Sequence, residues 1–247
     1  MTPKNFKGLI LAAGRGSRFQ AESGEPLPKV LRPLLGKPMV SYVIDTLTQV
    51  GVDDVTLIIG YRGDDVKQAI GESVNYVLQQ EQKGSGHAVA CAKDAFVDFT
   101  GDLIIMCGDS PLFKAETLSK MMDEHADTNA VATLAAAVLG DPLGYGRIVR
   151  DEEGNLAGIV EEKCASPEQR AIKEVNGGAY IFSAPWLFEN ISNMALNEAG
   201  EYNLTDMVRV ALGQGKVVSS VKCDSQELLG VNTPAQLKAV EDILQGR

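Results

Sequence analysis

The sequence predicts an α/β fold, in which a mostly parallel central sheet is flanked by helices and joined by a smaller mixed or antiparallel lobe. Short apolar runs alternate with helix-like stretches through the first half of the chain, and a glycine-bearing turn follows the first of these runs. In the second half, closely spaced strand-like runs are separated by turn signals. Strand alternating with helix favours parallel strands with right-handed crossovers, and such sheets bind ligands beyond the carboxyl ends of their strands.

The first half supplies the predicted parallel strands and the helices between them. The strand-length apolar runs are Gly8–Ala12, Val55–Ile59, Val74–Leu78 and Leu103–Cys107. The helix-like stretches are Pro38–Val50, Asp64–Ile70, His87–Phe96 and Thr117–Ala126. In the first helix Met39, Val43 and Leu47 recur every four residues, which places them on one buried face. We therefore expect residues 1–129 to form a Rossmann-like half of the molecule.

The alternation of strand-like and helix-like stretches stops after Ala130, which indicates a smaller lobe over residues 130–230. The predicted strands there are Val131–Val138, Arg147–Arg150, Leu156–Glu161, Ala179–Phe182 and Lys216–Cys223. The predicted helices are Ala184–Ile191 and Leu204–Leu212. Thr233, Pro234 and Gln236 form a capping box with Pro at the first helical position, so residues 231–247 should end in a helix. We expect residues 1–247 to fold as a single domain with two lobes.

Composition and charge exclude several classes of protein. The 247 residues carry a formal net charge of −10, which disfavours binding to nucleic acid or to an anionic membrane. The four cysteines are far apart and indicate reduced thiols in a cytoplasmic protein. The apolar run after Lys7 is too short for a secretion signal. An anionic ligand would therefore depend on a local cluster of cations.

The first glycine turn favours a polyphosphate over a dinucleotide. A dinucleotide-binding turn needs three glycines, but Phe19 stands in the third position after Gly14 and Gly16. Arg15 and Arg18 add cations to this loop, and Lys29 follows in a second motif. Glycines let backbone N–H groups approach an anion, and nearby cations neutralise it, so we expect a triphosphate here.

Three further polar positions allow both a functional and a structural interpretation. Asp109 directly follows a buried strand, where it could ligate Mg²⁺ or could form an Asp-Ser-Pro turn. Asn232 lies beside a helix start that Thr233 can cap, which leaves its amide available as a ligand. Gln79 could read the edge of uracil or, with its amide turned over, that of cytosine, or it could belong to a polar surface loop in which His87 packs in the first helical turn, which composition alone favours.

The second lobe offers neutral and acidic groups that suit sugar hydroxyls. They occur in Gly144-Tyr145-Gly146-Arg147, Glu161-Glu162-Lys163 and Asn176-Gly177-Gly178. Each segment also has a purely structural interpretation, namely a glycine turn, a solvated charge run and an Asn-Gly hairpin.

The order of these motifs resembles one family closely. Leu-Ala-Ala-Gly-x-Gly-x-Arg, Leu-Pro-Lys-Val-Leu, Gln-x-Glu-Gln-x-Gly-Ser-Gly-His-Ala, Gly-Asp-x-Pro-Leu, Gly-Tyr-Gly-Arg, Ile-Val-Glu, Val-Asn-Gly-Gly and Gly-Val-Asn occur in sequence. Together they resemble the N-terminal uridylyltransferase domain of the bifunctional GlmU proteins, which pair it with an acetyltransferase. The resemblance runs from Gly8 to about Leu244. It implies a nucleotide-diphospho-sugar transferase fold of the GT-A-like type, without the left-handed β-helix of the acetyltransferase.

The resemblance implies a role for each matching residue. Those expected to bind the nucleotide are Leu11, Ala12, Ala13, Gly14, Gln79, Gln82, Gly84 and Ser85. Arg18 and Lys29 would be catalytic, acting on the charge of the reacting phosphates. Asp109 and Asn232 would hold Mg²⁺. The sugar would contact Gly144, Glu161 and Asn176.

The chain departs from the family pattern at several positions. The loop between Phe19 and Pro28 is a few residues longer than usual, Gly177 stands where Thr is frequent, and Cys164 stands where Asp is common. The implied reaction is Mg²⁺-dependent transfer of UMP from UTP to N-acetylglucosamine 1-phosphate or a related sugar 1-phosphate. Alternatives are transfer from another nucleoside triphosphate or to another sugar phosphate, giving UDP-glucose, a dTDP-sugar or a CDP-type product, and a non-catalytic sugar-nucleotide-binding protein. The sequence leaves the physiological sugar and the oligomeric state open.

Overall fold

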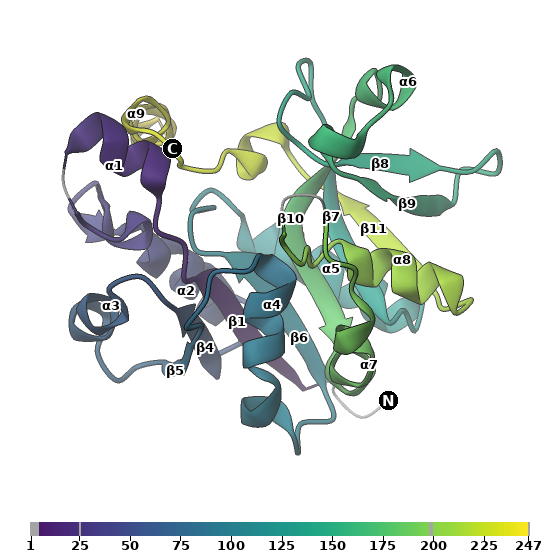
Figure 1. Cartoon of the computed structure of the whole chain (residues 1–247), viewed down its shortest axis with the longest axis horizontal. Helices are drawn as coiled ribbons and strands as arrows, with labels where there is room; N and C mark the ends of the chain where they lie inside the picture. The colour runs from purple at the N-terminus through teal and green to yellow at the C-terminus, as the bar shows by residue number, and fades with distance from the viewer. Residues whose placement is uncertain (1–4, 25, 198–199, 247) are drawn as a thin grey trace.

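A computed structural model of the chain describes residues 5–24, 26–197 and 200–246. It confirms the α/β fold: within these residues nine strands form one sheet, and helices cover both of its faces (Figure 1). A short hairpin lies apart from this sheet. None of the described helices combines the length and the apolar character that crossing a bilayer requires.

The sheet is mostly parallel, as predicted. Its main path, from one edge to the other, consists of β11 (Val218–Lys222), β7 (Ala132–Val138), β10 (Glu174–Ser183), β6 (Asp102–Cys107), β1 (Phe6–Ala12), β4 (Val55–Ile59) and β5 (Asn75–Leu78). The neighbours from β6 to β5 are parallel, and so are β7 and β11. Only β10 on this path runs against its neighbours, because it is antiparallel to both β6 and β7.

A side branch leaves the main path at β10. There β8 (Arg147–Arg150) pairs with β10 and with β9 (Leu156–Val160), both in antiparallel fashion. The separate hairpin joins β2 (Pro33–Leu34) to β3 (Lys37–Pro38).

Helices and 3₁₀ turns connect the strands. The α-helices are α1 (Ser17–Ser23), α2 (Met39–Gln49), α3 (Gly63–Ile70), α4 (Ser85–Cys91), α5 (Ala115–Asp127), α6 (Pro167–Arg170), α7 (Ala184–Asn190), α8 (Asp206–Gly213) and α9 (Pro234–Gln245). The 3₁₀ turns are η1 (Lys29–Leu31), η2 (Lys93–Phe96), η3 (Glu162–Cys164), η4 (Ile191–Asn193) and η5 (Ser225–Leu228). In Figure 1, α4, α7 and α8 lie on the viewer's side of the sheet.

Two apolar cores lie on opposite faces of the sheet because side chains alternate along each strand. Leu9 of β1 joins the core under α4, α7 and α8, whereas Ile10 joins the core under α2 and α5. Leu103 and Ile104 of β6 divide between the two cores in the same way. A smaller cluster packs α9 against α1. These central strands read as continuous apolar runs because both of their faces are buried.

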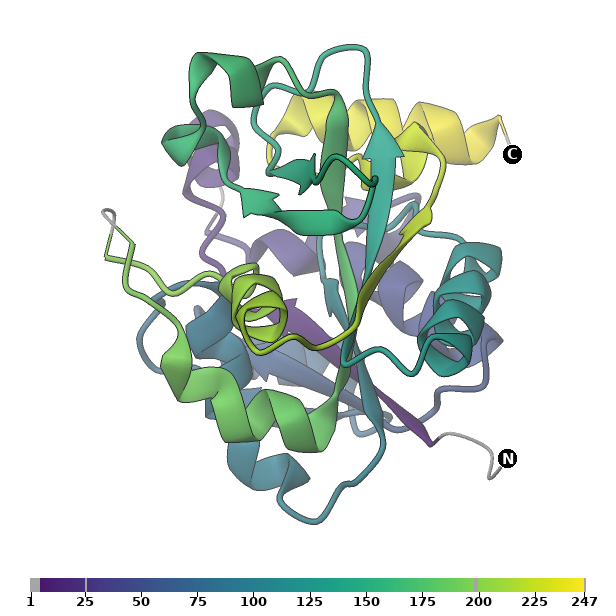
Figure 2. The same cartoon turned by 90° about the vertical axis from the view of Figure 1, so that its right-hand side faces the viewer.

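The strand β10 differs from the prediction. The sequence predicts a strand at Ala179–Phe182 and allows an Asn-Gly hairpin before it, but β10 begins at Glu174 and passes through both positions. The hairpin interpretation is wrong, because Asn176-Gly177-Gly178 forms a bulge inside the strand. Gly178 supplies the left-handed backbone of this bulge, at φ +77°. As a result β10 runs from one half of the molecule to the other (Figure 1, Figure 2).

Several helix boundaries also differ from the prediction. The stretch His87–Phe96 is divided into α4 and η2, and the expected loop after Gly16 contains α1. Thr233 caps α9 by accepting from the Gln236 N–H at 3.2 Å, as expected. The reciprocal half of the capping box is absent, since the Gln236 side chain accepts from the Asn232 N–H at 2.8 Å instead.

Candidate active site

The candidate site begins where the central strands β1 and β6 end. Their register pairs Leu11 with Cys107, so both carboxyl ends lie at one edge of the sheet. The Gly108 N–H donates to the Leu11 carbonyl at 3.0 Å and holds the two chain exits together. The glycine turn after β1 therefore lies beside Asp109 after β6. This is the sheet edge at which parallel α/β folds bind ligands.

Three adjoining cavities follow this edge. The first, of about 300 Å³, is lined by Leu11, Ala12, Ala13, Gly14, Lys29, Val30, Gln79, Gln82, Gly84, Ser85, Ala88, Cys107, Asp109 and Glu201. The second, of about 370 Å³, lies beyond Asp109 and is lined by Arg18, Asp109, Ser110, Leu143, Gly144, Tyr145, Gly146, Asn176, Gly177, Gly178, Leu228, Gly230, Asn232 and Gln236. The third, of about 400 Å³, is lined by Gly144, Glu161, Glu162, Lys163, Cys164, Asn197, Glu201 and Asn203.

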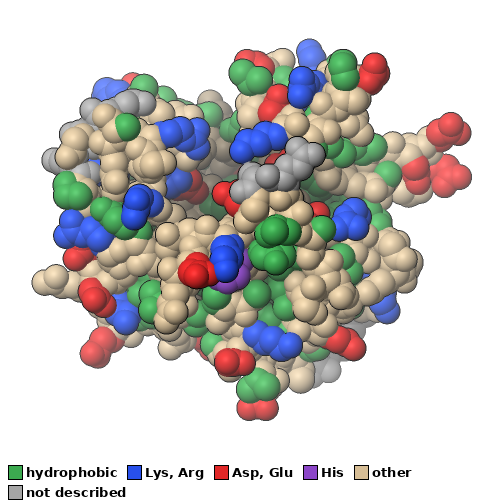
Figure 3. Space-filling model, viewed as in Figure 1, with side chains coloured by type: hydrophobic (Ala, Val, Ile, Leu, Met, Phe, Trp, Pro, Cys, Tyr) green, Lys and Arg blue, Asp and Glu red, His purple; other side chains and the backbone are tan. Residues whose placement is uncertain are grey.

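The three cavities form one cleft because they share walls. Asp109 lines the first and second, Gly144 the second and third, and Glu201 the first and third. The space-filling view is hollowed on this face, with Lys and Arg side chains beside the hollow (Figure 3). The residues that the sequence nominates for nucleotide, phosphate, metal and sugar line this cleft, with the exception of Arg15.

The junction of the first and second cavities holds a compact polar cluster, which we call the phosphate-end cluster: Arg18, Lys29, Asp109 and Asn232. The Lys29 ammonium forms an ion pair with Asp109 Oδ2 and donates to Asn232 Oδ1 at 3.0 Å. Arg18 Nη2 donates to the same Asn232 oxygen at 3.1 Å. The Asp109 carboxylate therefore faces the cleft and a cation, whereas a purely structural Asp-Ser-Pro turn would direct it to backbone N–H groups.

Gly16 explains how Lys29 reaches this cluster. Its φ is +66°, and a Cβ built there would lie 2.7 Å from Cβ of Lys29. The stem of Lys29 therefore packs directly on the glycine turn. Arg18 stands in α1 rather than in a loop, and Arg15 lies over the Tyr61 ring at 5.2 Å instead of lining the cleft.

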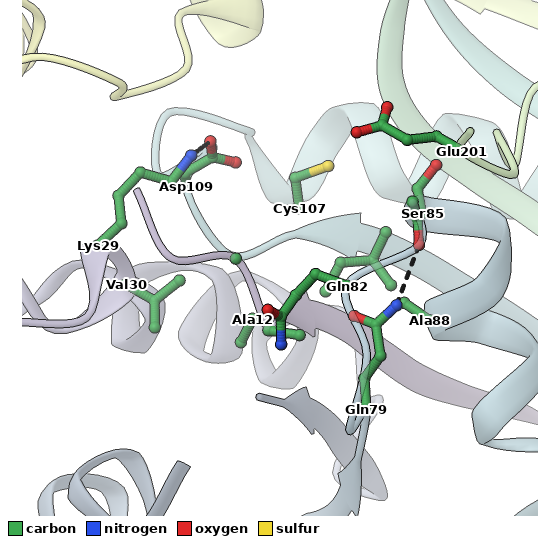
Figure 4. A pocket seen from close by; sticks show the side chains of 14 residues that line it. Ala12, Lys29, Val30, Gln79, Gln82, Ser85, Ala88, Cys107, Asp109 and Glu201 are labelled. Carbon is green, nitrogen blue, oxygen red and sulfur yellow. Dashed lines mark hydrogen bonds and ion pairs between the residues drawn. The ribbon is translucent and has the colours of Figure 1, made fainter. Parts of the chain in front are cut away.

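The far end of the first cavity is formed by a buried amide. Gln79 is 3% exposed, and its Nε2 donates to the Gly84 carbonyl at 3.2 Å and lies 2.9 Å from His87 Nδ1. A carbonyl can only accept, so the donor end of the amide must face Gly84. The Gln79 Oε1 has no hydrogen-bond partner within the described part of the chain. Figure 4 shows Gln79 and Ser85 at the opposite end of the cavity from Lys29 and Asp109.

In the second cavity, the bulge of β10 fixes Asn176. Its Nδ2 donates to the Tyr180 hydroxyl at 2.6 Å, and its Oδ1 accepts from the Gly178 N–H at 3.3 Å. Its own backbone N–H donates to the Gly146 carbonyl at 2.9 Å. The bulge thus connects Asn176 to the glycine turn that lines the opposite wall.

In the third cavity, the acidic segment is more than a solvated charge run. The guanidinium of Arg147, which is buried, donates to Glu162 Oε2 at 2.6 Å, and the Gly144 N–H donates to the same oxygen at 3.2 Å. The hydrogen bond from Arg147 lowers the pKa of the Glu162 carboxyl below its usual value. Glu161 points the other way and accepts from the Thr205 hydroxyl at 2.8 Å.

Two thiols line the cleft in different environments. Burial raises the pKa of Cys107 in the first cavity to about 12, so this thiol stays protonated at neutral pH. Cys164 at the third cavity is exposed. The described cysteines form no disulfide, which agrees with the reduced thiols expected from the sequence.

Some lining residues escape the sequence analysis. Val30, Ala88 and Cys107 are neighbours of the motifs, so their positions follow once the strands are placed. Glu201 carries no local signal, because it lies in an irregular segment that returns to the cleft through the tertiary fold.

A metal ion would find few ligands from the protein. Among the residues that the structure describes, no group of three or more His, Cys, Asp or Glu side chains is arranged to hold a metal. Asp109 and Asn232 offer hard oxygens that converge on one cation, the Lys29 ammonium. This donor set fits Mg²⁺, which keeps several waters and takes only one or two protein oxygens beside substrate phosphates.

Comparisons with known proteins agree with this geometry. A family model described as "Nucleotidyl transferase" matches residues 7–227. The chain is 42% identical over 241 residues to the bifunctional protein GlmU of Geobacillus sp. (strain WCH70), covering 97% of this chain and 52% of that protein. It is 40% identical over 245 residues to GlmU of Exiguobacterium sibiricum, covering 98% of this chain and 54% of that protein. The chain thus spans about half the length of these relatives.

Solved structures confirm the fold. A candidate glucose-1-phosphate thymidylyltransferase from Bacillus anthracis, in complex with sucrose, superimposes with a TM-score of 0.80 at 21% identity, covering 98% of this chain and 96% of that one. A UDP-glucose pyrophosphorylase complexed with UDP-glucose superimposes with a TM-score of 0.78 at 19% identity, covering 97% and 98%. At such identities the likeness concerns the GT-A-like fold alone.

Proposed function

The chain belongs to the nucleotidyl transferase family, and on that premise we propose that it transfers UMP from UTP to N-acetylglucosamine 1-phosphate or a closely related sugar 1-phosphate. The products are a UDP-sugar and pyrophosphate. The observation that carries this proposal is the first cavity, which has a fixed amide at one end and the phosphate-end cluster at the other.

The orientation of Gln79 supports a uracil base. Its Nε2 is committed to Gly84 and His87, so only Oε1 remains for a ligand. Uracil presents an N3–H donor to this acceptor. In the same pose N3 of cytosine is itself an acceptor and would set its lone pair against that of Oε1, so cytosine could donate only after a shift that brings its N4–H to Oε1. Turning the amide over would set Oε1 against the Gly84 carbonyl. The flipped arrangement that could read cytosine is therefore disfavoured.

The phosphate-end cluster supports in-line phosphoryl chemistry. An oxygen of the sugar phosphate attacks the α-phosphorus of UTP, a new P–O bond forms, and the bond to the β-phosphate oxygen breaks to release pyrophosphate. The attacking oxygen is already ionised at neutral pH, so no general base is needed. Lys29 and Arg18 neutralise charge on the α-phosphate and the leaving pyrophosphate, and catalysis rests on positioning and electrostatics.

Asp109 and Asn232 are proposed to hold Mg²⁺. Their oxygens are hard donors directed at one cationic position, which the Lys29 ammonium occupies. When bound, Mg²⁺ would screen the repulsion between the two reacting phosphates. The Lys29 side chain would then move, so that its ammonium group contacts a phosphate oxygen instead of these two oxygens.

The sugar is proposed to occupy the second and third cavities. Asn176 and Glu161 offer neutral and acidic acceptors, and the Gly144 turn lies between them. Hydrogen-bonding groups of this kind match sugar hydroxyls and an acetamide, and the Arg147–Glu162 ion pair holds the wall in place.

A panel of substrates tests the proposal. UTP, CTP, dTTP and GTP are each combined with N-acetylglucosamine, N-acetylgalactosamine and glucose 1-phosphates, and pyrophosphate release is measured with Mg²⁺ and with EDTA. We expect the highest kcat/KM for UTP with N-acetylglucosamine 1-phosphate and no release in EDTA. Preference for CTP or GTP would contradict the base assignment. No release from any pair would favour a non-catalytic sugar-nucleotide-binding protein.

One alternative has an observation in its favour. Thymine shows the same N3–H edge as uracil, so Gln79 accepts from both bases equally well. A thymidylyltransferase would be revealed by dTTP outperforming UTP in the same panel.

A further inference from the structure

Two segments far apart in the sequence are joined beside the cleft. The base loop, Lys83-Gly84-Ser85-Gly86, follows Gln79 and opens α4. The sugar-side segment, Tyr202-Asn203-Leu204-Thr205, precedes α8, and its Asn203 lines the third cavity. Nothing in the proposed chemistry requires these segments to touch.

Three hydrogen bonds connect the segments directly. The Tyr202 N–H donates to the Lys83 carbonyl at 2.8 Å, and the Gly86 N–H donates to the Tyr202 carbonyl at 2.8 Å. The Leu204 N–H donates to the Ser85 hydroxyl at 3.0 Å, over 119 positions of sequence. Two of these bonds join backbone to backbone and do not depend on residue type. The third depends on the Ser85 hydroxyl, so a substitution of Ser85 can remove it.

The approach of the two segments is as close as backbone allows. A Cβ built on Gly84, whose φ is +98°, would lie 2.4 Å from the Tyr202 carbonyl oxygen. A side chain at this position would therefore separate the segments. Any displacement of the base loop must consequently be passed to Tyr202 and its neighbours, because packed backbone does not compress.

The last residue of the sugar-side segment, Thr205, contacts the Glu161 carboxylate, which lines the proposed sugar site. The Thr205 hydroxyl donates to Glu161 Oε1 at 2.8 Å. Gln79 in turn donates to the Gly84 carbonyl within the base loop. A continuous series of hydrogen bonds thus runs from Gln79 through the base loop and the sugar-side segment to Glu161.

We propose that Ser85 and Thr205 are positioning residues that couple the two substrate sites. Ser85 ties the base loop to the sugar-side segment, and Thr205 holds the Glu161 carboxylate in the orientation that receives the sugar. A base bound against Gln79 fixes the base loop and, through this connection, fixes Glu161. Nucleotide binding therefore raises the affinity for the sugar 1-phosphate. This inference rests on the proposed function, because it assigns Glu161 to the sugar.

The first test concerns Thr205. Thr205→Val removes the hydroxyl and keeps the shape of the side chain, so we expect KM for N-acetylglucosamine 1-phosphate to rise roughly tenfold while KM for UTP and kcat stay within about twofold. Thr205→Ser should restore the wild-type KM, because it restores the donor. Thr48→Val is the matched control, since the Thr48 hydroxyl donates to Ile44 within α2. Equal changes in both KM values, or no change, would overturn the role of Thr205.

The second test concerns Ser85 and does not require turnover. Calorimetry measures the Kd of N-acetylglucosamine 1-phosphate with and without saturating α,β-methylene-UTP, whose α–β bridge is not cleaved. In the wild type we expect the nucleotide to tighten sugar-phosphate binding by roughly five- to tenfold, which is an ordinary coupling between two sites. In Ser85→Ala the gain should fall below about twofold. No gain in the wild type would refute the coupling, and the same gain in both proteins would refute the role of Ser85.

The two proposals can fail separately. If the wild type releases no pyrophosphate from any substrate pair, the proposed function fails whatever the calorimetry shows. If it turns over UTP but shows no gain in affinity, only the coupling fails, and if Ser85→Ala retains the full gain, only the role of Ser85 fails.

Discussion

The proposed nucleotide wall and the proposed sugar wall of the cleft, which belong to the first and third cavities, are built in different ways. In the first cavity, Gln79 is buried on the parallel half of the sheet and is fixed by a main-chain carbonyl and by His87. In the third cavity, Glu161 is only partly buried at the end of the antiparallel branch, and one hydroxyl from Thr205 holds it. A wall fixed by buried backbone should select one hydrogen-bonding edge, whereas a partly buried group held by a single side chain should discriminate less between substrates.

This contrast predicts which of the two substrates is selected more strictly. We expect the base to be selected more strictly than the sugar, since leaving a buried acceptor unpaired costs more than losing a solvated contact. The phosphate-end cluster stands between the two walls and differs from both, because its charges satisfy one another until a ligand separates them. The predictions below test these three regions.

The largest effect should come from the phosphate-end cluster. Lys29→Ala removes a fixed cation from the reacting phosphates, and we expect kcat to fall about 10²- to 10³-fold, as for loss of one donor to a developing anion. Steady-state pyrophosphate release measures it. Lys37→Ala is the control, because Lys37 also forms an ion pair, with Asp45, but is exposed and distant from the cleft. Near-normal kcat in folded Lys29→Ala would remove Lys29 from the reacting centre.

Loss of the base acceptor should have the next largest effect. Gln79→Leu removes the oxygen that accepts N3–H, and we expect kcat/KM for UTP to fall about 10- to 100-fold with loss of the preference for UTP over CTP. Gln80→Leu changes the adjacent exposed residue, which does not line the first cavity, and should leave both values unchanged. Retained UTP preference in Gln79→Leu would show that the base is read elsewhere.

A smaller effect should follow from a change at Gly16, which packs against the Lys29 side chain and positions its ammonium group. In Gly16→Ala the new methyl group meets the Lys29 stem, so we expect kcat to fall about tenfold through misplacement of the ammonium. Gly24→Ala imposes a similar backbone strain, at φ +72°, with no atom within 4 Å of the new Cβ. Comparing kcat and the melting temperature of the two variants separates misplacement from strain. Equal loss of kcat in both would contradict the contact.

The smallest effect concerns the two thiols of the cleft. Because burial holds the pKa of Cys107 at about 12, this thiol should resist iodoacetamide at pH 8, whereas exposed Cys164 should react. Peptide mass spectrometry over time measures both rates. We expect modification of Cys164 to raise KM for the sugar phosphate by at most a few-fold, since the sugar wall tolerates change. Faster labelling of Cys107 would show that the first cavity opens more than its walls indicate.

The sequence predicts the fold well where periodicity and burial agree. The runs at Val55–Ile59 and Leu103–Cys107 match β4 and β6 closely, because both faces of these strands are covered and almost every residue is apolar. Asn176–Gly178 were open to a hairpin interpretation because Asn-Gly is the usual hairpin signal. This segment is part of a strand because β10 pairs with both β6 and β7. Such long-range pairing leaves no local signal in the sequence.

The site was predictable where residues lie in consecutive motifs, and less so where the fold brings segments together. Asp109 and Gly14 follow strands, so their edge of the sheet is known once the strands are placed. Glu201 reaches the cleft through an irregular segment without helix or strand periodicity, and Thr205, which the sequence places in a helix, reaches Glu161 from the turn before α8. The sequence nominates Gln79 but does not give the orientation of its amide, because the Gly84 carbonyl that fixes it acts through the folded geometry of the loop.

The course of β10 also bears on how the molecule can be divided. Residues from the second half of the chain, including fully buried Ile181 and Phe182, complete the edge of β6 in the first half. A fragment that stops near residue 129 would present an open row of unpaired backbone groups along β6, a template for aggregation. We therefore expect that the first half does not fold as a self-sufficient unit, and circular permutation or domain insertion should be attempted in the surface loops rather than at that boundary.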